Sequence, residues 1–331
     1  MRTFQKTAIL LMIVFMCFAC SNNYYNVPRE SFEKKVKILG VAPIFLDSES
    51  DIRYPEKEAL ANLIKEQNRK NEKELVALLR ETGTFFSVRF LDGDPEGLFG
   101  NLLLRRELRN DASVVYNKYF YNPSELKELV IKNGLDAVMF TVVSGITRED
   151  TVRSGNLVSY LKSNYNCLVI TSQIYDAEGN ILWEFPNFRG YSPELPALIE
   201  LQYPDFDEAN ANSTDYVDIK FKSIPGITRA FNKTDDSSLP GGGKVSKLYM
   251  SIFNDMVDLL RPEKEFPFLD KKEDRSNEPK QLEPPSADDI KVGPVKNETA
   301  PPTKVQPEVI KEEPVISQPI KEEPIKEEVI K

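Results

Sequence analysis

The last seventy residues of this 331-residue chain limit where a folded core can lie. The stretch from Pro262 to Lys331 holds 12 of the 23 prolines, 17 acidic and 12 basic residues, and neither tyrosine nor tryptophan. Such a segment cannot bury enough apolar surface to offset the entropy cost of ordering its backbone. It ends in a repeat of the type IKEEP. We therefore expect a disordered Pro/Glu/Lys-rich tail over 262–331, serving as a spacer or as an arm toward a partner.

The first nineteen residues have the pattern of a secretory signal. Arg2 and Lys6 give a positive start, and an apolar run follows from Ala8 to Ala19. As a helix, this run would reach about 18 Å, which is well short of a hydrocarbon core of about 30 Å. We therefore expect residues 1–19 to form a signal peptide and not a membrane span.

The residues around Cys20 resemble a bacterial lipoprotein processing box. Ala19 is the small residue before the cysteine, while Cys17 and Phe18 stand where an aliphatic and a small residue are usual. The resemblance implies that Cys20 is acylated and becomes the mature amino terminus, with residues 20–31 as a tether. Ser21, in place of aspartate, resembles the pattern of lipoproteins that move on to the outer membrane. In the alternative interpretation, the segment is an ordinary signal or an uncleaved anchor and Cys20 has no role.

The chain contains no histidine, and this excludes several classes of chemistry. Ser-His-Asp and Cys-His nucleophile systems and HExxH zinc sites all need imidazole. The formal net charge of −9 argues against nucleic-acid binding, which usually leaves a basic patch. Once Cys17 is removed and Cys20 is acylated, Cys167 is the only free thiol. Its apolar neighbours predict a buried, unreactive core cysteine.

Residues 32–261 carry the patterns of secondary structure. Apolar runs predict strands at 35–45, 85–91 and 135–146, and a hairpin of 167–175 with 180–184 around an Asp-x-x-Gly turn. Helical patterns cover 55–81, with an exposed polar middle at 65–73, and 97–109, 122–132 and 245–260. This order predicts one α/β domain with a mixed sheet covered by helices. Residues 185–243 are expected to form a long, mostly irregular insertion with a strand at 216–221.

Several motifs resemble functional sites, but their spacing or context is wrong. Residues 241–244 read GGGK, yet Ser238 and Val245 stand where a phosphate-binding loop needs glycine and a hydroxyl residue. The acidic cluster Asp205, Asp207, Asn210 and Asp215 lacks the glycine and the glutamate of a calcium loop. Trp183 fits a packing residue better than a sugar platform. We therefore predict no catalytic, cofactor or metal site.

Four stretches give the chain a family resemblance. Residues 35–45 resemble an opening strand, 85–91 a second strand, 135–146 a Gly-Ala-Asp-Tyr-Val-type strand, and 174–183 a hairpin whose turn contains Asp176 and Gly179. In this order they resemble the periplasmic lipoproteins related to the curli secretion-channel lipoprotein and the penicillin-binding-protein activator lipoprotein. The resemblance implies a core similar to the amino-terminal domain of TolB.

These observations favour a non-enzymatic lipoprotein, anchored through Cys20 to the outer membrane and facing the periplasm. It would bind and position an envelope protein, either a cell-wall synthase or a secretion or surface-assembly machine. One alternative is a homo-oligomeric secretion channel of the curli type, although neither 147–165 nor 185–243 alternates apolar and polar residues as membrane hairpins do. A second alternative is a carboxylate-dependent wall-active enzyme.

Overall fold

The computed structural model describes residues 24–111, 114–155, 159–187 and 195–262. The chain divides between Phe266 and Pro267, and every described residue belongs to the first unit. The predicted signal peptide, Cys20 and, apart from Pro262, the predicted tail lie outside the described residues. None of the described helices has the length and apolar character needed to cross a membrane.

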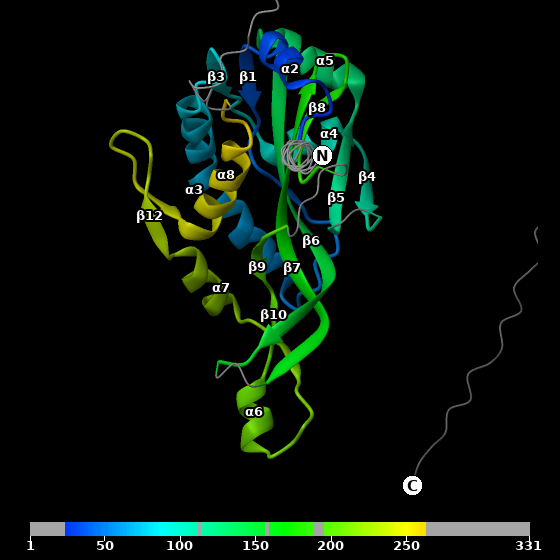
Figure 1. The fold of residues 1–331 in the computed structure, drawn as a ribbon, viewed down its shortest axis with the longest axis vertical. Helices are drawn as coiled ribbons and strands as arrows, with labels where there is room; N and C mark the ends of the chain where they lie inside the picture. Colours follow the sequence, from blue (N-terminus) through cyan, green and yellow to red (C-terminus); the bar gives the residue numbers. More distant parts are fainter. Residues whose placement is uncertain (1–23, 112–113, 156–158, 188–194, 263–331) are drawn as a thin grey trace, which may run out of the picture. The chain divides into compact units, whose positions relative to one another are not determined.

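The described residues form helices and strands in mixed order along the chain (Figure 1). The helices are α2 (Arg29–Lys35), α3 (Lys57–Glu81), α4 (Pro95–Leu102), α5 (Pro123–Lys132), α6 (Phe206–Ala211), α7 (Ile224–Phe231) and α8 (Lys247–Asp258). The strands of the first half are β1 (Ile38–Val41), β2 (Phe45–Asp47), β3 (Ser87–Phe90), β4 (Leu103–Arg109), β5 (Tyr116–Tyr121) and β6 (Ala137–Arg153). Those of the second half are β7 (Tyr160–Asp176), β8 (Ile181–Phe185), β9 (Ala197–Glu200), β10 (Gln202–Pro204), β11 (Ile219–Phe221), β12 (Thr234–Asp236) and β13 (Lys244–Ser246).

The main sheet is mixed, as predicted. Its strands run in the order β3-β1-β6-β7-β8, with β2 also beside β6 and β9 also beside β7. β1 is parallel to β3 and β6, whereas β7 is antiparallel to β6, β8 and β9. Three small ribbons, β4–β5, β10–β11 and β12–β13, lie outside this sheet. The predicted α/β class with one mixed sheet covered by helices is confirmed.

The continuous apolar run of β6 follows from burial on both faces of the sheet. Met139 and Val143 belong to the core cluster that includes α3 and α8, whereas Val138 and Phe140 belong to the cluster that includes α4, α5 and the β4–β5 ribbon. Successive side chains of a strand point to opposite faces, so a doubly covered strand is apolar at every position. β6 therefore has the central place that its sequence predicts.

Two predicted elements of the first half differ from the structure. The helix expected over 97–109 ends at Leu102, and residues 103–109 form β4, which pairs antiparallel with β5. Tertiary pairing with the aromatic strand β5 outweighs the helical propensity of these residues. The strand expected over 35–45 is broken into β1 and β2 around Pro43, which has no N–H to donate to a neighbouring strand.

The described part of the predicted insertion, 185–187 and 195–243, contains more regular structure than we expected. Its described part contains β9, β10, α6, β11, α7 and β12, each only three to eight residues long. Elements this short give weak periodic patterns and depend on packing for their stability. The predicted strand at 216–221 is present in part, as β11.

The polar middle of α3 was expected to be exposed, but one of its faces is buried: Asn68 and Asn71 are buried, whereas Lys70 is exposed. Asn68 donates to the carbonyl of Ile44 (3.2 Å) and accepts a hydrogen bond from the Tyr249 hydroxyl (2.6 Å). Asn71 accepts from the backbone N–H of Ser246 (2.9 Å). These side chains hold α8 and β13 against α3, and both asparagines have the hydrogen-bond partners that buried polar groups need.

Substitution of Glu74, which lies on the same face of α3, is expected to destabilise the fold measurably. Its side chain is buried, and it accepts hydrogen bonds from the Ser238 N–H (2.6 Å) and from the Ser237 hydroxyl. Changing Glu74 to alanine leaves these donors unpaired, so we expect the free energy of unfolding to fall by about 1–3 kcal/mol. Urea denaturation measures the loss. Glu66→Ala is the control because its exposed pair with Lys70 contributes about 0–1 kcal/mol, and equal losses in both variants would contradict the prediction.

Candidate functional site

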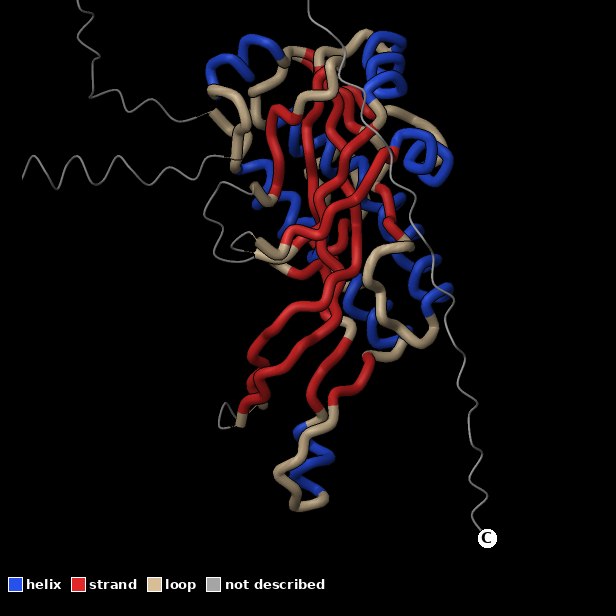
Figure 2. The backbone as a smooth tube through the Cα atoms, turned by 90° about the vertical axis from the view of Figure 1, so that its right-hand side faces the viewer, coloured by secondary structure: helices blue, strands red, loops and turns tan. Residues whose placement is uncertain are grey.

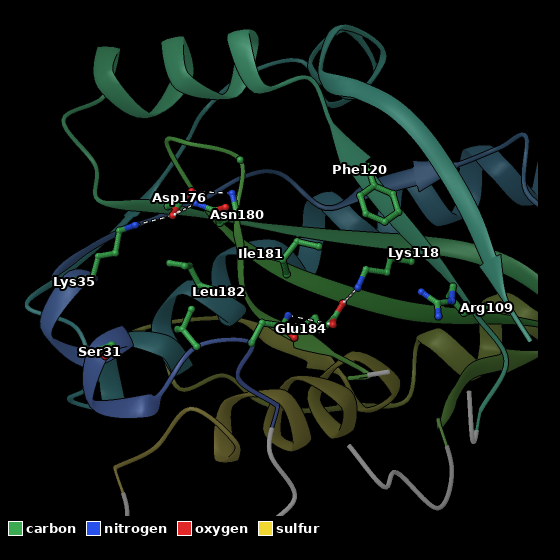
Figure 3. Close-up of a pocket in the computed structure, with 13 residues that line it drawn as sticks. Ser31, Lys35, Arg109, Lys118, Phe120, Asp176, Asn180, Ile181, Leu182 and Glu184 are labelled. Carbon is green, nitrogen blue, oxygen red and sulfur yellow. Dashed lines mark hydrogen bonds and ion pairs between the residues drawn. The ribbon is translucent and has the colours of Figure 1, made fainter. Parts of the chain in front are cut away.

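A hollow of about 750 Å³ lies where three segments distant in the sequence meet (Figure 3). These segments are the chain before and within α2, the edge strand β8 with the turn that precedes it, and the β4–β5 ribbon. The hollow is lined by Asn26, Val27, Ser31, Lys35, Arg109, Lys118, Phe120, Asp176, Gly179, Asn180, Ile181, Leu182 and Glu184. Its volume is in the range of ligand pockets.

The first wall is the amino-terminal segment, which pairs with the edge of the sheet. Asn26 donates its N–H to the Leu182 carbonyl (2.9 Å), and the Tyr24 carbonyl accepts from the Glu184 N–H (3.1 Å). Tyr24 and Tyr25 are buried, as is Phe32 of α2. The described fold therefore includes residues that the sequence analysis placed in the 20–31 tether. The edge of β8 offers unpaired backbone groups, and two tyrosines gain burial by covering it.

The second wall is the β4–β5 ribbon, which is fixed across the sheet by its inward side chains. The Tyr119 hydroxyl donates to the Asp47 carboxylate (2.8 Å), to which Arg106 also donates (2.6 and 2.9 Å). Asn117 donates to the Ser144 hydroxyl (3.2 Å) on β6. Because side chains alternate along a strand, the intervening positions of β5, Lys118 and Phe120, are the ones that line the hollow.

A buried ion pair joins the ribbon to the third wall. Lys118 Nζ lies 2.7 Å from a carboxylate oxygen of Glu184 on β8, and their side chains are only 11% and 3% exposed. The other Glu184 oxygen accepts from the Asn26 amide (3.2 Å). Figure 3 shows the contact between Lys118 and Glu184 on the wall of the hollow. Glu184 thus connects all three segments that form the hollow.

Asp176 organises the other end of the hollow. Its carboxylate accepts hydrogen bonds from the backbone N–H groups of Glu178 (3.1 Å) and Asn180 (2.8 Å) and from Lys35 Nζ (2.6 Å). Gly179 has φ +84°, a conformation that glycine adopts without strain. The predicted Asp-x-x-Gly turn is therefore confirmed, and it ties β7 and β8 to α2.

The pKa of Asp176 gives the ion pair with Lys35 a defined pH dependence. Burial alone would raise the pKa of this carboxyl, but hydrogen bonds from Lys35 and Asn180 outweigh burial and hold it below the ordinary value of 3.8. The same contact raises the pKa of Lys35 above 10.5. A carboxyl with a lowered native pKa stabilises the fold above its unfolded-state pKa, and this contribution is lost as the pH falls through the native pKa.

We therefore expect Asp176→Asn to lower the free energy of unfolding by about 1–3 kcal/mol at pH 7, because the amide cannot replace the carboxylate as an acceptor of several bonds. The difference from the original chain should shrink below pH 3.8, where the unfolded carboxyl is protonated. Urea titrations at pH 7 and pH 3 measure both values. A difference that stays constant between these pH values would contradict this assignment.

Apolar side chains also line the hollow, which makes it suited to binding. Val27, Phe120 and Ile181 are half-buried and present apolar surface beside the two ion pairs. Arg109 adds a cation, although Asp111 lies 2.9 Å from its guanidinium. In the ranges that the structure describes, no three His, Cys, Asp or Glu side chains are grouped so as to hold a metal ion. Apolar surface with a few oriented charges is typical of ligand and peptide sites.

Comparisons with known proteins show no family membership. No protein-family model and no curated protein sequence matches the chain. Among solved structures, it is similar to a Helicobacter pylori protein described as a neuraminyllactose-binding hemagglutinin homolog. That likeness has a TM-score of 0.30 and 8% identity, over 67% of this chain and 84% of that chain. A likeness at this level establishes neither a shared family nor a shared function, and the resemblance to the curli-channel and synthase-activator lipoproteins stays a prediction.

The residues that were considered as possible functional sites from the sequence lie in different parts of the structure. Trp183 is fully buried in the core on the strand that borders the hollow, as a packing residue. Cys167 is buried on β7, and burial raises the pKa of its thiol to about 12, so it is predominantly protonated at neutral pH. Asp205 and Asp207 lie at the start of α6, and residues 241–243 connect β12 to β13.

Most residues that line the hollow were not predicted from the sequence. Lys118 and Phe120 belong to a strand that was not predicted, and Asn26 and Val27 were assigned to the tether. One usable signal was the run Tyr116–Tyr121, in which five of six side chains are aromatic or charged. The pairing of residues 24–26 with β8 left no signal, because no periodic pattern fits three residues.

Proposed function

We propose that this protein is a non-enzymatic envelope lipoprotein, anchored through Cys20 to the outer membrane and facing the periplasm. In this proposal the hollow between the amino-terminal segment, β8 and the β4–β5 ribbon receives a segment of an envelope protein. That partner belongs to a cell-wall synthase or to a secretion or surface-assembly machine. No cofactor, metal or nucleic acid takes part.

One observation carries the proposal: the segment that would connect the fold to the lipid also forms a wall of the hollow. Asn26 lines the hollow and lies six residues after Cys20. Six extended residues span at most about 20 Å. A partner segment bound there would therefore be held close to the membrane surface, which is what a lipoprotein that positions an envelope machine requires.

The lining supports a protein as the ligand. The half-buried ring of Phe120 is stacked under the guanidinium of Arg105, 4.0 Å from the ring centroid, and lies beside the apolar Ile181. Aromatic and arginine side chains are enriched in protein interfaces. The net charge of −9 and the paired charges of the hollow do not favour a polyanion.

Site-specific cross-linking tests the proposal. A photo-reactive amino acid at position 120 of the full chain, expressed in its own cells, should give a discrete adduct with an envelope protein, identified by mass spectrometry. The matched control is position 131, because Ile131 is 64% exposed on α5 and does not line the hollow. The proposal fails if position 120 gives no adduct or if both positions give the same adducts.

The native mass distinguishes the alternatives. Light scattering of the lipidated protein in mild detergent should give a monomer or dimer. A closed ring of many copies would instead favour the homo-oligomeric channel. Release of soluble fragments from purified peptidoglycan would favour the carboxylate-dependent enzyme.

A further inference from the structure

A second hollow lies at the far end of the β6–β7 hairpin. These two strands pair without interruption as far as Arg153 and Tyr160, well beyond the other strands of the main sheet (Figures 1 and 2). The hairpin end is closed by hydrogen bonds between Ser154 and Ser159, with the Ser154 N–H 2.8 Å from the Ser159 carbonyl. β10 and α6 lie beside it, and the region between them encloses about 420 Å³.

One exposed tyrosine lines this hollow, and a second contacts one of its lining residues. Tyr203 of β10 lines it and is 39% exposed. Arg153 also lines it, and the Arg153 guanidinium lies 5.7 Å from the ring centroid of Tyr160, which is 63% exposed. The Tyr203 ring is thus left in contact with solvent at the hollow and the Tyr160 ring beside a lining residue, although burying each would be favourable.

Some polar side chains of this hollow make hydrogen bonds or ion pairs with described residues, and others do not. Asp205 is paired with Lys220 at 3.0 Å and caps α6. The side chains of Asp207 and Asn210 make no hydrogen bond or ion pair with any described residue, and Arg153 makes only its contact with Tyr160. A free carboxylate, a free amide and a guanidinium therefore face one space beside an aromatic surface.

This combination matches the chemistry of a sugar. A pyranose ring has an apolar C–H face, which packs on an aromatic ring, and hydroxyl groups at its edge, which planar carboxylate, amide and guanidinium groups bond in pairs. The mixed charge of Arg153 and Asp207 does not favour a strongly anionic ligand. The volume falls within the range of small-ligand sites. We propose that the end of the β6–β7 hairpin, with β10 and α6, binds an oligosaccharide chain.

Glycan binding by the full chain in mild detergent tests this site. A printed array of defined oligosaccharides, including β-1,4-linked N-acetylglucosamine chains, identifies the best ligand, and calorimetry gives its affinity. We expect Tyr203→Ala and Asp207→Ala each to weaken binding at least tenfold. Tyr203→Phe should retain binding within about threefold, because it keeps the ring that packs on the sugar.

Phe86→Ala is the matched control. Phe86 is 86% exposed and precedes β3, which Figure 1 places at the end of the fold opposite to α6. Its variant should bind like the original chain, and thermal melting should show that every variant is folded. Failure of the original chain to bind any oligosaccharide on the array would overturn the proposal, as would equal losses in Tyr203→Ala and Phe86→Ala. These outcomes are independent of the cross-linking at position 120, since the two hollows share no lining residue.

Discussion

Replacing Cys20 with serine is expected to move essentially all of the protein from the membrane fraction to the soluble fraction of the envelope. Serine has no thiol to acylate, so the variant lacks the acyl chains that would anchor the protein in the membrane. Each buried methylene contributes about 0.8 kcal/mol, and two or more acyl chains give stable anchoring. Fractionation followed by immunoblotting measures the distribution, and mass spectrometry of the mature amino terminus measures acylation.

Cys17→Leu is the matched control for this experiment. It removes a neighbouring thiol and places an aliphatic residue where lipoprotein processing boxes usually have one. The Cys17→Leu protein should stay in the membrane fraction with its amino terminus acylated at Cys20. If Cys20→Ser remained in the membrane fraction, the segment would be an uncleaved anchor and the lipoprotein proposal would be wrong.

Changing Lys118 to alanine is expected to lower the free energy of unfolding by about 3–5 kcal/mol, because it leaves the nearly buried Glu184 carboxylate without its cation. Glu184→Ala should have a similar effect, since it leaves the Lys118 ammonium without its anion. The double substitution K118M/E184L should recover much of the loss, because apolar side chains can fill the same space without a charge to desolvate. Urea denaturation of the original chain and the three variants measures these differences.

The exposed pair of Lys162 and Glu149 provides the comparison. Its atoms lie 2.9 Å apart, but its side chains are 60% and 62% exposed. Alanine at either position should lower the free energy of unfolding by about 0–1 kcal/mol, because solvent screens the attraction between the two charges. Equal costs for the two pairs would show that the contact between Lys118 and Glu184 does not hold the walls of the hollow together.

The elements predicted correctly are those whose sequence signals are local. Asn122 and Pro123 open α5 with a capping side chain and a fixed φ, and Gly134 follows its end with φ +59°. The apolar run of β6 needs no knowledge of its neighbours, because burial on both faces gives the same pattern wherever it occurs. The hairpin of β7 and β8 is marked by the Asp176 turn.

The missed features all depend on contacts between distant residues. Asn68 and Asn71 look like solvent-facing positions of a helix. Their partners, Tyr249 and Ser246, lie 181 and 175 residues later in the chain. β4 is a strand only because β5 lies beside it. The hollow combines the amino-terminal segment, the ribbon and β8, and no spacing in the sequence links three segments that are brought together by the fold.

The pairing of residues 24–26 with β8 also affects whether the sheets of neighbouring copies of this protein can associate. An anchored protein is confined to a surface, where molecules meet far more often than in solution, and open sheet edges then tend to join one copy to the next. The amino-terminal segment occupies one edge of the sheet. On the opposite edge, Arg80 covers the Val88 carbonyl of β3 through two hydrogen bonds. Both edges of the main sheet are thus covered in part, which disfavours edge-to-edge association at the crowding that the proposed anchor would impose.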